Sequence, residues 1–148
     1  MKVLLEQADL AEPEVIVRGY PNSEQVKNII GLLSSSQSSQ KMFFFKDGRE
    51  YIFDLKDVIY FEADRNKIMA RIGEAVYEVS GRLYELEGAL GAKGFVRVSK
   101  GVLVNVNHIV SVEAEFSGNY TANMKCGGHI VISRKYVKAF RKYVLEVY

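Results

Sequence analysis

The chain has 148 residues, of which 48% are hydrophobic and 26% charged, and its formal net charge is +2. This composition is close to the average for soluble globular proteins, so it argues against extensive disorder. No apolar stretch approaches the ~20 residues of a membrane-spanning helix, and the N-terminus lacks a signal-peptide pattern, so we expect a cytoplasmic protein.

The first elements predict a small appendage. Val3 to Leu5 and Glu14 to Arg18 have the composition of short strands. Ser23 is suited to cap a following helix. Apolar residues spaced by three and four form one face of this helix: Val26, Ile29, Ile30 and Leu33. We therefore expect residues 1–33 to form a β-β-α appendage that is too small to bury much by itself and serves dimerisation or partner docking.

Residues 34–40 consist of Ser and Gln alone, so they predict a flexible connector between the appendage and a domain at 41–148. Charge is distributed unevenly across this division. Residues 1–40 hold three Lys/Arg and five Asp/Glu, a net of −2, whereas residues 41–148 hold seventeen and thirteen, a net of +4. The basic part of the chain is therefore C-terminal.

After the connector, short strand-like segments follow one another, separated by turn residues. The expected strands are Phe43–Lys46, Glu50–Asp54, Ile59–Ala63, Lys67–Ile72, Ala75–Ser80, Phe95–Val98, Val102–Asn105, Ile109–Glu115, Tyr120–Cys126 and His129–Ile132. Asp47-Gly48 and Gly127-Gly128 are suited to hairpin turns because they tolerate positive φ angles. So many short strands favour a mostly β fold of small antiparallel sheets with short helices.

Two helices are expected within this domain. Ser80 is a suitable cap for the first, and Gly91 follows its end. Its expected inward residues are Leu83, Tyr84, Leu86 and Leu90. Ser133 is a suitable cap for the second. Its expected apolar side consists of Tyr136, Val137, Phe140 and Val144.

The last helix also carries a basic cluster without an acidic residue: Arg134, Lys135, Lys138, Arg141 and Lys142. Such a cluster produces a positive field that a polyanion would follow. A charge run by itself is equally typical of a solvated helix face.

The residue types of an enzyme site do not occur together. His108 and His129 have no further ligand at metal-binding spacing, and the only cysteine, Cys126, is more typical of a small buried side chain than of a reactive thiol. Gly91-Ala-Lys-Gly94 is too short for a phosphate-binding loop. We expect no catalytic activity, cofactor, metal or small-molecule substrate.

Three polar segments instead follow strand ends: Asp64-Arg65-Asn66-Lys67, Ser99-Lys100-Gly101 and Ser133-Arg134-Lys135. Loops at one edge of a β framework present such side chains on a rigid support. Arg pairs with a guanine edge and Asn with adenine, while Lys and Ser hold phosphates. The segments therefore indicate a nucleic-acid surface, although each one alone is ordinary for a loop.

Three ordered stretches resemble the LytTR family of DNA-binding domains. The first is Leu55-Lys-Asp-Val-Ile-Tyr-Phe-Glu-Ala63, and the second is Phe95-Val-Arg-Val-Ser-Lys-Gly-Val-Leu-Val-Asn105, continuing to Ile109. The third is Ile132-Ser-Arg-Lys-Tyr-Val137. The resemblance extends over nearly all of residues 41–148 and implies a sandwich of small antiparallel sheets in a bacterial transcriptional regulator.

The resemblance also implies sequence-specific binding of double-stranded DNA by loops that enter successive major grooves. The positions that match the DNA-contacting segments are Arg65, Asn66, Lys67, Ser99, Lys100, Arg134 and Lys135. Lys100 stands where the family varies, so it is assigned either to a base or to phosphate, and Lys138 is expected on phosphate. Arg97 and Asn105 are expected to brace the loop between them.

The resemblance further implies a stand-alone regulator without a receiver domain, of a type sometimes held in check by a small membrane protein. We expect a homodimer, because two copies on a repeated site gain affinity through effective concentration. Two alternatives stay open. An RNA or single-strand binder would use Tyr51, Tyr60 and Phe61 as stacking platforms, and a protein-interaction module would use the basic helix only as a solvated face.

Overall fold

The computed structural model describes residues 2–9, 14–37 and 40–146. The chain divides into two compact units, Met1–Ser38 and Ser39–Tyr148. No helix in the described part of the chain is long and apolar enough to cross a lipid bilayer.

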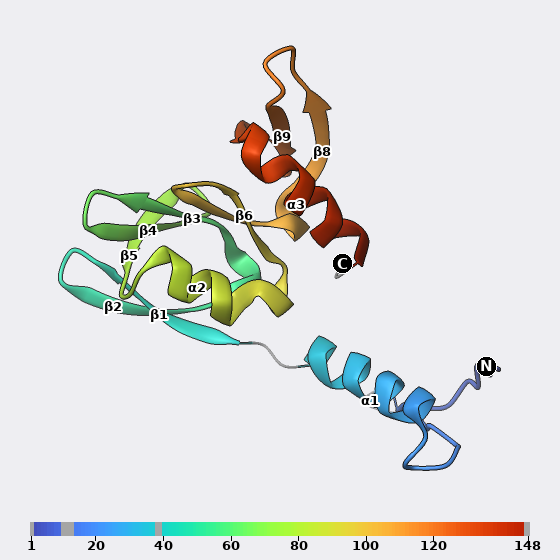
Figure 1. Ribbon diagram of the computed structural model, residues 1–148. Coiled ribbons are helices and arrows are strands. Elements are labelled where there is room, and N and C mark those ends of the chain that lie inside the picture. The colour runs from blue at the N-terminus through green and yellow to red at the C-terminus, as the bar shows by residue number, and fades with distance from the viewer. Residues whose placement is uncertain (1, 10–13, 38–39, 147–148) are drawn as a thin grey trace. The chain divides into compact units, whose positions relative to one another are not determined.

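The N-terminal unit contains one helix, α1 (Glu24–Gln37) (Figure 1). The predicted cap is confirmed, because Ser23 Oγ accepts a hydrogen bond from the Val26 backbone N–H at 3.3 Å. The two predicted strands do not form: residues 3–5 and 14–18 are not assigned to a strand. Among the described residues of this unit, the strand-forming residues have no ladder partner, and local preference alone does not stabilise an extended segment.

The predicted connector is also partly wrong, because α1 continues through its first four residues to Gln37. Once a helix is nucleated, each further residue adds a hydrogen bond, so Ser and Gln extend it at small cost. Residues 38 and 39 lie outside the described residues.

The larger unit is mostly β, as predicted. A seven-stranded antiparallel sheet has the order β2-β1-β5-β4-β3-β7-β6. Its strands are β1 (Lys41–Lys46), β2 (Arg49–Asp54), β3 (Val58–Asp64), β4 (Lys67–Ile72), β5 (Ala75–Val79), β6 (Phe95–Ser99) and β7 (Val102–Asn105). A three-stranded antiparallel sheet in the order β10-β9-β8 consists of β8 (Ile109–Ala114), β9 (Tyr120–Met124) and β10 (His129–Ile132).

Two α-helices and three short 3-10 helices complete this unit. The α-helices are α2 (Leu83–Leu90) and α3 (Arg134–Glu146). The 3-10 helices are η1 (Leu55–Asp57), η2 (Gly91–Lys93) and η3 (Val106–His108). The hairpin signal at Asp47-Gly48 is confirmed, because both residues have positive φ angles, +52° and +74°.

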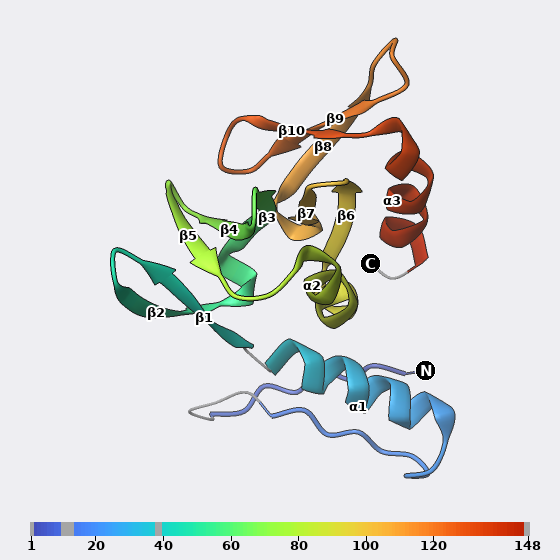
Figure 2. The same cartoon turned by 60° about the vertical axis from the view of Figure 1, so that its left-hand side comes forward.

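The part of the seven-stranded sheet formed by β3, β6 and β7 is covered on both faces (Figure 2), whereas Phe43 of β1 and Ile52 of β2 are more than half exposed. On one face, α2 packs Leu83, Leu86 and Leu90 against Phe61 and Phe95. On the other, the three-stranded sheet and α3 form a second core that includes Val98, Val104, Ala122, Ile132 and Phe140. The two cores hold strands β3, β6 and β7 between them, which makes their ends a rigid base for the turns that follow.

Details of both helices differ from the prediction. Helix α2 begins after Arg82 and not after Ser80, because Gly81 at φ +109° separates the strand from the helix. Tyr84 is 65% exposed and does not face the core. In α3 the inward residue near the end is Tyr143 and not Val144, since the Tyr143 hydroxyl bonds to Gly94 N and Gly91 O.

Candidate nucleic-acid interface

The three polar segments meet at one edge of the larger unit. The Ala63 N–H of β3 donates to Gly101 O at 2.8 Å, which joins the β3–β4 turn to the β6–β7 turn. The Ser133 N–H donates to Val98 O, also at 2.8 Å, which places the start of α3 beside the end of β6. Backbone bonds therefore hold together segments that are far apart in the sequence.

The β3–β4 turn presents Arg65 and Asn66, both of which are exposed. Arg65 has φ +56°, a left-handed conformation in which a non-glycine residue is strained. Lys67 lies at the start of β4 and forms an exposed ion pair with Glu78 of β5, with 3.7 Å between Nζ and Oε2. Part of the positive charge of this turn is thus neutralised by the protein itself.

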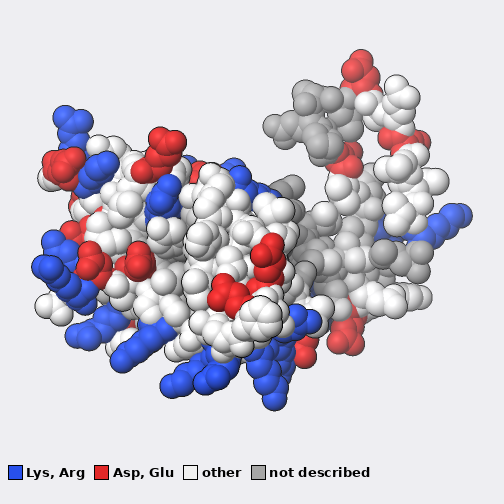
Figure 3. Space-filling model, turned by 90° about the horizontal axis from the view of Figure 1, so that it is seen from above, with Lys and Arg blue, Asp and Glu red and all other residues white. Residues whose placement is uncertain are grey.

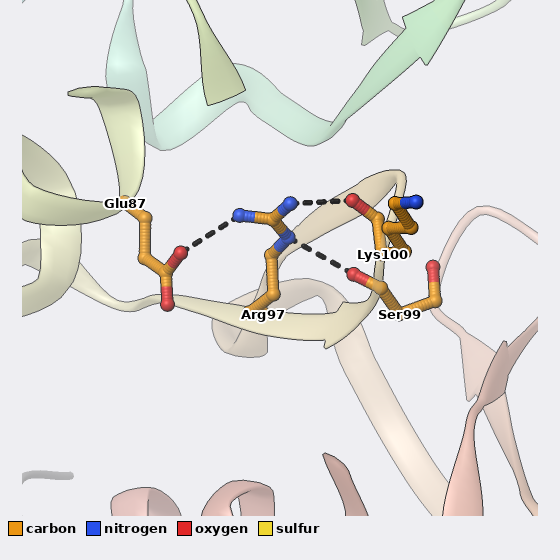
Figure 4. A network of polar contacts seen from close by, with 4 residues as sticks. All are labelled: Glu87, Arg97, Ser99 and Lys100. Atoms are coloured by element: carbon orange, nitrogen blue, oxygen red, sulfur yellow. Dashed lines mark hydrogen bonds and ion pairs between the residues drawn. The ribbon is translucent and has the colours of Figure 1, made fainter. Parts of the chain in front are cut away.

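The β6–β7 turn is braced from beneath by Arg97 (Figure 4). Its Nε donates to Ser99 O at 2.9 Å, and Nη2 donates to Lys100 O. Its Nη1 forms an ion pair with Glu87 Oε2 of α2 at 2.8 Å. The Arg97 side chain is 17% exposed, and its planar guanidinium fixes two consecutive carbonyls of the turn and anchors them to the helix.

Arg97 thus has the predicted bracing role, whereas Asn105 acts elsewhere. The side chain of Asn105 is buried at the far end of β7, where Nδ2 donates to Val58 O at 3.0 Å. Its Oδ1 accepts from the Asn107 N–H at 3.1 Å. Asn105 therefore fastens η3 and β7 to the start of β3 and does not touch the β6–β7 turn.

The start of α3 presents Arg134, Lys135 and Lys138, all exposed. The Arg134 N–H donates to Asn119 Oδ1 at 2.9 Å, so a residue of the β8–β9 turn caps the helix. Further along the helix, the Arg141 guanidinium carbon lies 5.9 Å from the centre of the Tyr120 ring, which directs this cation over β9.

All eight predicted contact residues reach solvent. Ser99 is half-buried, and the other seven residues are exposed: Arg65, Asn66, Lys67, Lys100, Arg134, Lys135 and Lys138. Apart from the ion pair of Lys67, their side chains make no hydrogen bond or ion pair with any residue in the described ranges. Their donors are therefore free to bind a ligand.

A depression of about 410 Å³ lies between the two sheets at this edge. Its lining includes Tyr60, Glu62, Ser99, Asn119, His129 and Ser133. In the view of Figure 3, Lys and Arg lie along the lower border of the larger unit, and further Lys and Arg lie among the Asp and Glu at its left and upper left. The arrangement supplies hydrogen-bond donors and positive charge along a rigid edge, which suits a polyanion.

Residues 48–144 match the family described as the LytTr DNA-binding domain. The chain belongs to this family.

Two relatives show how the LytTR domain occurs in longer and in comparable chains. The sensory transduction protein LytT of Bacillus subtilis is 27% identical over 117 residues, which are 78% of this chain and 48% of that protein. The chain therefore spans about half the length of LytT. An uncharacterized HTH-type transcriptional regulator of Staphylococcus aureus is 25% identical over 135 residues, which are 91% of each chain.

The fold of the LytTR domain is also known from a solved structure. A LytTr DNA-binding domain from Bacillus cereus superposes with a TM-score of 0.67 at 24% sequence identity. The match covers 72% of this chain and 97% of that one. The predicted LytTR-like fold is therefore confirmed.

Other sites considered from the sequence have different surroundings. His108 contacts Lys56 O through Nε2 at 2.7 Å and so joins η3 to η1. Cys126 is exposed, contrary to the expectation of a buried side chain. Within the described residues, no group of three or more His, Cys, Asp or Glu is arranged to hold a metal ion.

Sequence reasoning missed three residues of the LytTR edge. Gly118 and Asn119 contact Arg134, and Glu87 anchors Arg97. Ser117-Gly118-Asn119 is recognisable as a turn, but nothing local indicates that it reaches the start of α3. Glu87 gives no sequence signal, because an acidic residue on a helix is ordinary.

Proposed function

We propose that this LytTR domain binds double-stranded DNA sequence-specifically, through its three turns in the major groove, and acts as a bacterial transcriptional regulator. The observation that carries the proposal is the single rigid edge at which free Arg, Asn and Lys side chains converge. Because the ligand is chromosomal DNA, the protein acts in the cytoplasm. The proposal includes no catalytic step.

Each side chain receives a role from its chemistry. Arg65 and Arg134 are assigned to guanine edges, and Asn66 is assigned to adenine. The remaining residues are assigned to phosphate, which fixes the position of the domain without reading sequence: Lys67, Ser99, Lys100, Lys135 and Lys138. The braced β6–β7 turn suits a phosphate role, because its position is set by the protein and not by the base sequence.

Single-stranded nucleic acid is disfavoured by the placement of the aromatic residues. Phe61 is fully buried between β3 and α2. Tyr51 packs in an aromatic cluster with Phe53 and Tyr77, and Tyr60 packs against the second core. Stacking on bases requires exposed ring faces, and these three rings are committed to the fold.

The first experiment identifies the preferred duplex by selection from random DNA and then compares Arg134→Ala with the parent protein. We expect a loss of ~1–3 kcal/mol on the preferred site, or roughly 5- to 150-fold in Kd, and relaxed choice at one base pair. The matched control is Lys93→Ala, which removes an exposed charge at the opposite end of β6. An unchanged binding curve for Arg134→Ala would contradict the assignment.

Phosphate contacts are tested through salt. Lys138→Ala should weaken binding to every duplex alike and reduce the slope of log K against log salt by about 1. Loss confined to one sequence would show instead that Lys138 reads a base. Single-stranded DNA and RNA of the same sequence serve as competitors, and efficient competition by either would contradict the duplex assignment.

We also propose that the N-terminal unit joins two copies into a homodimer. It buries Val26 but exposes Val3, Leu5, Val15 and Ile16 by 65% or more, a large apolar surface for so small a unit. The S. aureus relative is similar over 91% of both chains, so similarity is not confined to the DNA-binding unit. Two linked copies would engage two half-sites at once.

The mass of the full chain in solution tests the dimer. We expect a dimer for the parent and a monomer for Leu5→Asp/Ile16→Asp, because charges in an apolar interface are costly. Val110→Asp, on an exposed strand residue of the larger unit, is the control. A parent that is monomeric, or a double variant that stays dimeric, would contradict the proposal. Binding of the monomeric parent to a small membrane protein would assign the unit to partner control instead.

A further inference from the structure

The β8–β9 turn contacts Arg134, one of the two arginines to which a guanine contact is assigned. This turn comprises Glu115 to Asn119 and is closed by hydrogen bonds of its own. The Glu115 N–H donates to Asn119 O at 2.9 Å, and the Gly118 N–H donates to Glu115 O at 3.0 Å. The hydroxyl of Thr121 also bonds to the Glu115 carboxylate, so the turn is tied to β9. It is therefore a rigid element and not a loose connection.

Two independent contacts join this turn to Arg134. The backbone N–H of Arg134 is bound by Asn119 Oδ1, which fixes the first residue of α3. The side-chain stem of Arg134 lies against Gly118, where a Cβ would be only 2.7 Å from Arg134 Cδ and 3.2 Å from Cγ. Asn119 thus sets the position of the Arg134 backbone, and Gly118 leaves the space through which its side chain passes.

The exact position of the Arg134 side chain matters more for a contact to a base than for a contact to a phosphate. Bidentate pairing with guanine needs both guanidinium N–H groups in one plane and at set distances, whereas a phosphate accepts a cation from many directions. A small displacement of the Arg134 stem therefore weakens sequence discrimination before it weakens general affinity for DNA.

We infer that Gly118 and Asn119 are positioning residues that set the base specificity of Arg134. This inference rests on the proposed function and adds to it a segment outside the three predicted contact segments. The two residues act through Arg134 and need not touch DNA themselves. Their effect is on the ratio of specific to non-specific affinity.

The experiment measures Kd for the preferred duplex and for a duplex of unrelated sequence, using full-length variants. Gly118→Ala and Asn119→Ala should each lower the ratio of the two affinities by about 5- to 10-fold, with little change on unrelated DNA, since no charge is altered. The control for Gly118→Ala is Gly127→Ala. Gly127 has nearly the same φ, +87° against +88°, but a Cβ there meets nothing within 4 Å. This control places alanine at nearly the same positive φ without the contact to Arg134, so it should keep the ratio.

A conservative variant and a double-mutant cycle separate positioning from general damage. Asn119→Asp keeps an oxygen acceptor for the Arg134 N–H, so it should restore the ratio, although its charge weakens binding to both duplexes alike. In an Arg134→Ala background, Asn119→Ala should have no further effect on the ratio.

The outcomes distinguish a failure of the positioning role from a failure of the proposed base contact. If Arg134→Ala lowers the ratio while Gly118→Ala and Asn119→Ala do not, the positioning role is overturned and the proposed function stands. Equal losses on both duplexes, or additive effects in the cycle, also overturn it. If Arg134→Ala leaves the ratio unchanged, the base contact fails, and the positioning role fails with it.

Discussion

The β6–β7 turn and the β3–β4 turn lie side by side but are held in different ways. Beneath the β6–β7 turn, the Arg97 side chain binds two consecutive carbonyls and the Glu87 carboxylate. The β3–β4 turn has no such brace: its Arg65 and Asn66 side chains are free within the described part of the chain. One turn is fixed by a half-buried side chain, and the other is held by backbone hydrogen bonds, including the one from the Ala63 N–H to Gly101 O.

The difference separates two uses of arginine at one edge. Arg97 is mostly buried, and its side-chain donors bind groups of the protein. It therefore shapes a turn that includes Ser99 and Lys100. Arg65 has φ +56°, and its side-chain donors make no hydrogen bond or ion pair with the residues that the structure describes. The first arginine is structural, and the second is assigned to the ligand.

Removing the brace should have the largest effect. Arg97→Ala deletes two bonds to carbonyls and a partly exposed ion pair, so we expect the free energy of unfolding to fall by about 2 kcal/mol. DNA affinity should fall about tenfold, because Ser99 and Lys100 lose their fixed positions. Urea unfolding and fluorescence anisotropy with a duplex measure the two effects.

The control for the brace is Arg71→Ala. Arg71 donates one bond, at 2.9 Å, to Gly73 O in the β4–β5 turn, which is at the other end of β4 from Arg65. The Arg71→Ala variant should be slightly less stable than the parent protein and should bind DNA with the same affinity. Arg97→Lys should resemble Arg97→Ala, because an ammonium group does not reproduce the planar fork. Full DNA affinity in Arg97→Ala would show that the brace is irrelevant to binding.

Replacing Arg65 with glycine should have an effect of intermediate size, with no loss of stability but a loss of DNA affinity. Arg65→Gly should leave stability unchanged or raise it by up to about 1 kcal/mol, because glycine adopts positive φ without strain. DNA affinity should fall by roughly 5- to 10-fold through loss of a base contact. Thermal unfolding and anisotropy on the preferred duplex measure the pair of effects.

A matched substitution in another turn measures how much the positive φ angle alone affects stability. Asp47 has a similar φ of +52° in the β1–β2 turn, which carries none of the assigned contacts. Asp47→Gly should change stability in the same direction without reducing DNA affinity. A clear loss of stability in Arg65→Gly would mean that the Arg65 side chain supports the fold, which would remove the contrast with Arg97.

Freeing Lys67 should have the smallest effect. Glu78→Gln breaks an ion pair whose side chains are 64% and 43% exposed, so stability should change by less than about 0.5 kcal/mol. The released cation should raise DNA affinity about twofold and steepen the dependence on salt. Measuring Kd across a series of NaCl concentrations tests both the gain in affinity and the steeper dependence on salt. Adding Lys67→Met should abolish the gain, and a gain that persists would indicate only the loss of a negative charge.

Much of the larger unit could be predicted from the sequence because its signals are local. All ten strands of this unit and the Asp47-Gly48 hairpin follow from alternation and turn chemistry. Helix α3 starts after Ser133 as predicted, but the side chain that caps it is Asn119 and not Ser133. The eight predicted contact residues lie on segments that the fold brings to one edge. The predictions that were wrong concern residues without a packing partner. Among the described residues, 3–5 and 14–18 have strand composition but no ladder partner, and Tyr84 has the spacing of an inward residue but is exposed to solvent.

Within the larger unit, the sequence by itself determined which segments become strands, which turns carry Arg, Asn and Lys, and to which family the domain belongs. Only the tertiary structure decided which arginine is braced and which is free, and that the β8–β9 turn reaches Arg134. The reason is physical. Periodicity and turn preference act over a few residues, whereas the bonds between 63 and 101, 98 and 133, and 119 and 134 form only after two cores have packed the strands.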